Sequence, residues 1–176
     1  DHDTSERAEE LDPFDAANSG DITIISQCIN ENPDYLNEYE CDDNCTFLGY
    51  ACKRGHKHVV QFLLENRDIC VNRGQVVGYR IPRSVAEEWV EYTPLEIACE
   101  AGHVEIVQEL LKHPDIKLES IGAAMKKLPA ADENVRRIIG ALLCQSGNFH
   151  PSDHLDEEKD QELIAKICER LAPRKS

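Results

Sequence analysis

The sequence is poor in aromatic residues and in basic residues, and it lacks any long hydrophobic run. Aromatic residues make up 6% of the 176 positions, and hydrophobic residues 41%, which fits a globular helical protein with few bulky aromatic core residues. A net charge of −15 follows from 19 Lys and Arg against 34 Asp and Glu. This charge argues against general nucleic-acid binding and against adhesion to anionic membranes, since both need a basic surface.

Membrane and export signals are also missing. No stretch reaches the length of about 18 apolar residues that spans a bilayer, and no secretory signal is visible. The eight cysteines are scattered rather than clustered, so we interpret them as reduced thiols in an intracellular protein, cytoplasmic or nuclear. The chain begins at Asp1 rather than at Met, from which we expect a fragment of something longer.

What the sequence does contain is a helix–turn–helix pattern, clearest in TPLEIACEAGHVEIVQELL, residues 93–111. Pro94 suits the first turn of a helix, and Gly102 predicts a left-handed cap that ends it. His103 opens a second helix with one apolar stripe, formed by Val104, Ile106, Val107, Leu110 and Leu111. Neither helix can bury its apolar face alone, so the pattern predicts stacked copies.

Further copies of this pattern occur along the chain. NCTFLGYACKRGHKHVVQFLL matches it position by position, with Ala51 and Cys52 in place of Ala98 and Cys99. We predict repeats at residues 11–37, 44–72, 93–118 and 120–143, the last of them degenerate. Residues 1–10 are predicted to be an acidic tail or first helical turn, and residues 144–176 a loop followed by a capping helix.

The spacing of the turn glycines reveals an insertion. Gly20 and Gly55 are 35 positions apart, but Gly55 and Gly102 are 47 apart, so residues 73–92 carry extra sequence. In this insert, QVVGYRI predicts a β-ribbon with a bend at Gly78. The following SVAEEWVEY predicts a short helix capped by Ser84.

The insert also holds the only tryptophan, Trp89, with Tyr79, Tyr92 and three arginines nearby. This composition is typical of the centre of a protein interface. The alternative, which the sequence leaves open, is that Trp89 and Tyr92 fold back over the base of the insert.

The repeated units resemble the ankyrin repeat, whose period is about 33 residues and whose signature includes T-P-L-H-x-A. The third unit has TPLEIA and the second TFLGYA, so Glu96 and Gly49 stand where the family has a His that ties down the finger loop. The resemblance implies an all-α fold with short β-fingers. We expect an ankyrin-repeat solenoid of about four repeats, with an enlarged finger between repeats 2 and 3 and a C-terminal helix.

The resemblance also implies a non-enzymatic module that binds a peptide or protein surface through its concave face and fingers, as a scaffold, adaptor or substrate-recognition domain. The implied contact positions precede each turn glycine or lie in the fingers: Asn18, Ser19, Lys53, Arg54, Glu100, Ala101, Asp42, Asp43 and Tyr92. To these we add Arg80, Arg83 and Trp89 of the insert. The cationic members favour an acidic or phosphorylated partner segment.

Two other functions stay open. In the first, the chain is the targeting domain of a larger enzyme, such as a ubiquitin ligase, kinase or bacterial effector. In the second, it is the cytoplasmic architectural stack of a channel or scaffold. The sequence beyond the C-terminus distinguishes the first, and a size measurement in solution distinguishes the second.

The sequence gives little support for a catalytic, metal or nucleotide site. Cys52 and Cys99 share one small buried repeat position, which packing explains. His56 and His103 share a helix start, where we expect local hydrogen bonding. Only the pair His150 and His154 has a zinc-ligand spacing, and no glycine-rich phosphate loop occurs. We therefore predict no metal and no cofactor.

Overall fold

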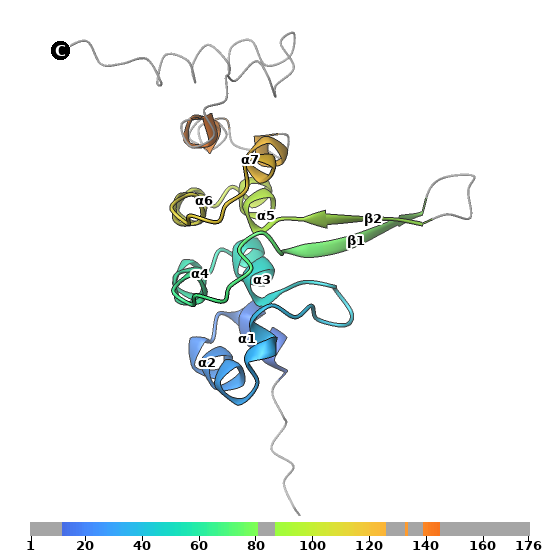
Figure 1. Ribbon diagram of the computed structural model, residues 1–176, viewed down its shortest axis with the longest axis vertical. Coiled ribbons are helices and arrows are strands. Elements are labelled where there is room, and N and C mark those ends of the chain that lie inside the picture. The colour runs from blue at the N-terminus through green and yellow to red at the C-terminus, as the bar shows by residue number, and fades with distance from the viewer. Residues whose placement is uncertain (1–11, 81–86, 126–132, 134–138, 145–176) are drawn as a thin grey trace, which may run out of the picture.

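The computed structural model describes residues 12–80, 87–125, 133 and 139–144. In this part of the chain, short helices stack in two layers (Figure 1). The first layer contains α1 (Pro13–Ser19), α3 (Phe47–Arg54), α5 (Pro94–Ala101) and α7 (Leu118–Met125). The second contains α2 (Ile22–Glu31), α4 (Lys57–Leu64) and α6 (Val104–Leu111). A 3₁₀ turn, η1 (Pro33–Leu36), follows α2.

Small side chains allow the first-layer helices to pack closely. Each of α1, α3 and α5 places a pair of small residues against its neighbours, and every one of them is fully buried: Ala16, Ala17, Ala51, Cys52, Ala98 and Cys99. The predicted packing role of Cys52 and Cys99 is therefore confirmed. The second-layer helices contribute the aliphatic stripes expected from the sequence, with Ile106, Val107 and Leu110 buried in α6.

Left-handed glycines form the turn inside each unit. Gly20, Gly55 and Gly102 have φ values of 87°, 81° and 76°, a region that only glycine adopts without strain. The left-handed cap predicted at Gly102 is thus confirmed.

Histidines follow the second and third of these turns, and each contacts the turn glycine of the preceding unit. A Cβ atom added to Gly20 would lie 2.9 Å from the His56 ring, and one added to Gly55 would lie 2.8 Å from the His103 ring. The His56 Nε2 atom also lies 2.9 Å from the Asn18 carbonyl oxygen. The local hydrogen bonding expected for His56 was therefore wrong, because this bond joins two units.

The two departures from the repeat signature have different structural reasons. The carboxylate of Glu96 accepts hydrogen bonds from the Thr93 backbone N–H (2.9 Å) and hydroxyl (3.1 Å), and so completes a capping box. At Gly49, a Cβ atom would lie 2.7 Å from the Cys45 Sγ atom and 2.8 Å from the Gly74 carbonyl oxygen. Any side chain there would displace the chain that crosses α3.

Two asparagines at equivalent repeat positions, Asn37 and Asn72, form hydrogen bonds between the loop after one unit and the loop after the next. The Asn37 side chain donates to the Asp68 carbonyl (2.8 Å) and accepts from the Cys70 N–H (2.7 Å). The Asn72 side chain repeats this arrangement one unit later, donating to the Asp115 carbonyl (2.8 Å) and accepting from Lys117 and Ser120. These bonds fix the spacing of the units on the side of the second-layer helices.

The insert forms a β-hairpin that projects from the stack (Figure 1). Strand β1 (Gln75–Arg80) pairs antiparallel with β2 (Glu87–Tyr92), from Gln75 opposite Tyr92 to Arg80 opposite Glu87. The helix predicted over SVAEEWVEY was therefore wrong, because pairing with β1 outweighs the local helix signal in a segment that contains the β-favouring residues Trp, Val and Tyr. Ser84 lies outside the described residues.

The bend predicted at Gly78 was also wrong. Gly78 lies within β1, opposite Trp89. A Cβ atom at Gly78 would come within 2.9 Å of the Trp89 ring, so glycine here makes room for the ring rather than for a change of direction.

Beyond α6, helix α7 packs on α5 with Ile121 and Ala124 buried. Residues 139–144 are helical, and Ile139 and Leu143 are buried there as the stripe requires. The fourth repeat as a unit stays a prediction. The N-terminal tail, the C-terminal helix and His150 with His154 lie outside the described residues. Within the described part, no helix is long and apolar enough to cross a membrane.

We expect Asn72→Ala to lower the free energy of unfolding by about 1–3 kcal/mol, because it leaves two backbone groups of the next connection without their partner. Urea denaturation followed by circular dichroism measures this. Asn30→Ala on the exposed face of α2 is the matched control, with an expected change within about 0.5 kcal/mol. Equal destabilisation by both substitutions would contradict the assigned role of Asn72.

Candidate functional site

The base of the hairpin is fixed to the start of α3. The Thr46 N–H donates to the Gly74 carbonyl (2.9 Å), and its hydroxyl donates to the Arg73 carbonyl (3.0 Å). The Val76 N–H donates to the Asn44 carbonyl (2.9 Å). The preceding finger, residues 38–46, thus lies beside β1 and sets the direction in which the hairpin leaves the stack.

A polar cluster beside the hairpin base joins this finger to β2. The Tyr39 hydroxyl donates to the Glu91 carboxylate, and the Arg73 Nε–H donates to the Tyr39 hydroxyl at 3.2 Å. The Arg73 guanidinium carbon lies 4.6 Å from the Tyr39 ring centroid, a cation–π contact. Burial and the bond to Glu91 raise the pKa of Tyr39 above its usual value, so the phenol stays neutral and keeps donating.

A cleft of about 440 Å³ lies where the hairpin meets the first-layer helices. Its lining comes from the ends of α3 and α5 and from one face of the hairpin, and consists of Lys53, Gln75, Val77, Tyr92, Ile97, Glu100 and Ala101. Four positions that the resemblance implied as contacts, from α3, β2 and α5, are therefore brought together: Lys53, Tyr92, Glu100 and Ala101. The cleft offers one cation, one anion and several apolar side chains.

Three lining residues were missed from the sequence. Gln75 and Val77 face the cleft because alternate residues of a strand share one face, and Ile97 lies one helical turn before Ala101. The strand pattern in QVVGYRI could have indicated the first two. It could not indicate which face of the hairpin the helices would cover.

The remaining predicted contacts do not line this cleft. Arg54 donates through its Nε–H to the Asn18 side chain at 2.6 Å, so these two predicted residues bind each other. The Asp43 carboxylate accepts from the Tyr50 hydroxyl at 3.0 Å, and the Asp42 N–H donates to the Glu40 carboxylate at 2.8 Å.

In the insert, Arg80 ends β1 opposite Glu87, and Arg83 lies outside the described residues. Trp89 and Tyr92 behave differently, although the sequence grouped them. The Trp89 side chain is 59% exposed, and its ring lies across Gly78 near the middle of the hairpin. Tyr92 is half-buried and packs against the core at the hairpin base. Only Tyr92 therefore covers the base, whereas Trp89 faces solvent.

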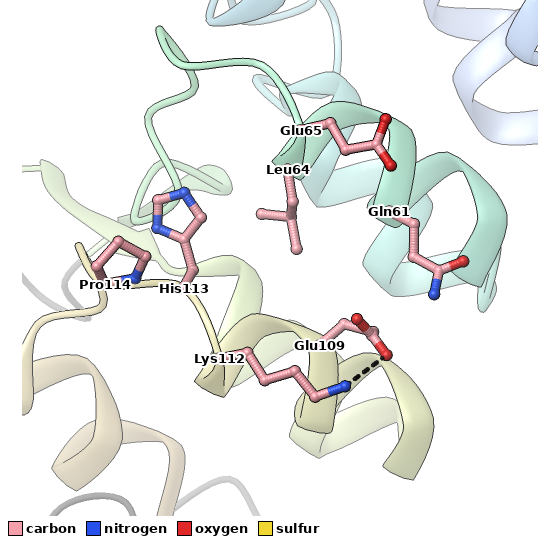
Figure 2. Close-up of a pocket in the computed structure, with 7 residues that line it drawn as sticks. All are labelled: Gln61, Leu64, Glu65, Glu109, Lys112, His113 and Pro114. Atoms are coloured by element: carbon pink, nitrogen blue, oxygen red, sulfur yellow. Dashed lines mark hydrogen bonds and ion pairs between the residues drawn. The ribbon is translucent and has the colours of Figure 1, made fainter.

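A second groove, of about 430 Å³, lies between α4 and α6 in the second helical layer. Figure 2 shows its lining residues, which are Gln61, Leu64, Glu65, Glu109, Lys112, His113 and Pro114. The Lys112 ammonium bonds to the Glu109 carboxylate at 3.1 Å, which neutralises both charges. None of the predicted contact residues lies in this groove.

The buried thiols are poorly suited to nucleophilic chemistry, because the thiolate is the reactive form. Burial raises the pKa of Cys45 to about 12 and also raises the pKa of Cys52 and Cys99. The seven described cysteines are free thiols. Across the residues that the structure describes, no cluster of three or more His, Cys, Asp or Glu side chains is arranged to hold a metal ion.

Two stacked layers of short helices, with glycine turns and a projecting finger, define a helical-repeat solenoid. A family model for ankyrin repeats matches residues 14–120 in three copies, more than half of the chain. The chain therefore belongs to the ankyrin-repeat family. A search of curated proteins found no match. Ankyrin repeats are generally protein–protein interaction modules.

Thiol modification should follow burial. We expect iodoacetamide at about pH 8 to label the exposed Cys41 and Cys70 rapidly in the folded protein, whereas Cys45, Cys52 and Cys99 stay protected because they are buried and protonated. Peptide mass spectrometry over a time course measures each site. Unfolding in urea should remove the difference, and equal rates in the folded protein would contradict the packing described.

Proposed function

We propose that this chain is a non-catalytic interaction module that receives a segment of a protein partner in the cleft between the hairpin and the ends of α3 and α5. The observation that carries the proposal is the convergence of Lys53, Tyr92, Glu100 and Ala101 on one concavity. A scaffold or adaptor role follows from binding without chemistry, and a fourth repeat on α7 would extend the same surface.

The rigidity of the cleft supports this role. Hydrogen bonds from Thr46 and Val76 hold the hairpin base in place, and the Tyr39–Glu91 contact ties β2 to the preceding finger at the same level. A site that is ordered before binding loses little conformational entropy when a partner arrives. The raised pKa values of Cys45, Cys52 and Cys99 support the proposal that these thiols are not catalytic.

The charges of the cleft suggest how a partner segment would lie. Lys53 is exposed at the end of α3 and would pair with a carboxylate or phosphate of the partner. Glu100, exposed near the end of α5, would pair with a cation. Val77 and Ile97, which also line the cleft, would contact an apolar side chain.

Ala101→Arg tests the cleft. Ala101 is exposed and ends α5, so Arg suits the helix C-terminus and should preserve the fold, while its side chain fills the cleft. We expect partners captured by the wild-type chain from an extract of its source cells to be lost, with affinity for a purified partner reduced about tenfold or more. Affinity capture with quantitative mass spectrometry, followed by calorimetry, measures both effects.

Gln61→Arg on the outer face of α4 is the matched control, since it adds the same charge at an exposed helical position outside the cleft. It should leave capture unchanged. If Ala101→Arg retained the wild-type set of partners, or if both variants lost it equally, the cleft would not be the binding site.

A further inference from the structure

Among the residues that the structure describes, no strand lies beside the outer edge of β2. Figure 1 shows β1 lying between the preceding finger and β2, with β2 on the far side. The following connection, from α6 to α7, spans only residues 112–117 and provides no finger to cover that edge. The hairpin therefore has one strand edge paired at its base and one without a neighbouring strand among the described residues.

The side of β2 toward which each residue points its N–H and C=O groups follows from the hydrogen bonds of β1. The Val76 N–H and the Gly74 carbonyl bond to the preceding finger, so they point away from β2. Backbone groups alternate in direction along an antiparallel strand. The N–H and C=O groups of Gln75 and Val77 therefore point toward β2, and those of their partners Tyr92 and Val90 point toward β1.

By the same alternation, the N–H and C=O groups of Glu87, Trp89 and Glu91 point outward from β2. In the part of the chain that the structure describes, no backbone hydrogen bond to these outward groups is formed by another segment. Such a row of unpaired donors and acceptors is a template for an added strand.

The side chains along this edge select the chemistry of that strand. Glu87, Glu88 and Glu91 make β2 acidic, and the exposed Trp89 lies among them. Two β2 strands from separate copies would bring glutamates against glutamates, so self-pairing is disfavoured. A strand with Arg or Lys at alternate positions would place cations opposite Glu87, Trp89 and Glu91, which share one face of β2.

We propose that the β2 edge binds an extended basic segment of a partner protein by β-strand addition, with an alternating Arg or Lys side chain on Trp89. The inference rests on the proposed interaction function and adds a second contact surface to it. Main-chain bonds to Trp89 and Glu91 supply affinity, and the cation–π and carboxylate contacts supply selectivity.

The probe is the peptide acetyl-Thr-Arg-Val-Arg-Val-Arg-Thr-amide, and the readout is the fluorescence of Trp89, the only tryptophan in the chain. We expect saturable binding of this peptide. In a control peptide, the backbone amides that would pair with β2 are N-methylated. This peptide should bind about tenfold more weakly or worse, because its charge is kept and its strand pairing is lost. Replacing its Arg residues with Glu should abolish binding. If the peptide failed to bind, or if the methylated peptide bound equally well, strand addition would be overturned.

Glu91→Pro and Glu91→Thr form a matched pair in the protein. Both remove the carboxylate, but only Pro removes the outward N–H, and an edge strand tolerates Pro at such a position. We expect Glu91→Pro to bind the peptide several-fold more weakly than Glu91→Thr, with both variants folded by circular dichroism. Equal affinities in the two folded variants would overturn the proposal.

The outcomes separate the two proposals. If the peptide fails to bind while Ala101→Arg still loses its partner, the strand-addition inference fails and the cleft remains the binding site. If the peptide binds as described while Ala101→Arg changes nothing, the cleft proposal fails and the β2 edge stands.

Discussion

The short helices of this protein depend on one constraint: none has enough apolar surface to be stable alone, so each must pack on the next unit. The close approach is possible because α1, α3 and α5 present Ala and Cys to one another, and because a histidine ring of one unit rests on the turn glycine of the unit before. A side chain at Gly20 or Gly55 would occupy the place of that ring and also strain the turn. The turn and the stacking contact are therefore one feature.

The same stacking positions the surface that we assign to binding. Because α3 and α5 are adjacent, Lys53 at the end of one and Glu100 at the end of the other line a single cleft. The hairpin completes it, since Thr46 holds the hairpin base through both backbone and hydroxyl. A change in the packing of α3 on α5 would thus alter the distance between the cleft charges without altering any residue that lines it.

The stack was predictable from the sequence because helical periodicity and glycine turns are local signals that repeat. The hairpin was only half predictable. QVVGYRI has a strand pattern by itself, but EEWVEY has helix-favouring glutamates and becomes a strand only through pairing with β1. The candidate site, like the hairpin, was only partly predictable from the sequence. Repeat positions indicated Lys53, Tyr92 and Glu100, whereas Arg54 was expected to be available and instead bonds to Asn18 across a distance of 36 positions.

The sequence by itself determined the repeated unit, its left-handed turns and the small residues that face the neighbouring helix, because all three depend on contacts within a few residues or on backbone conformation. Only the tertiary structure decided which face of the hairpin meets the helices, which of Trp89 and Tyr92 is exposed, and which strand edge lies open. Those outcomes depend on hydrogen bonds between segments distant in the chain, such as Asn44 with Val76, and no local pattern specifies the partner of such a bond.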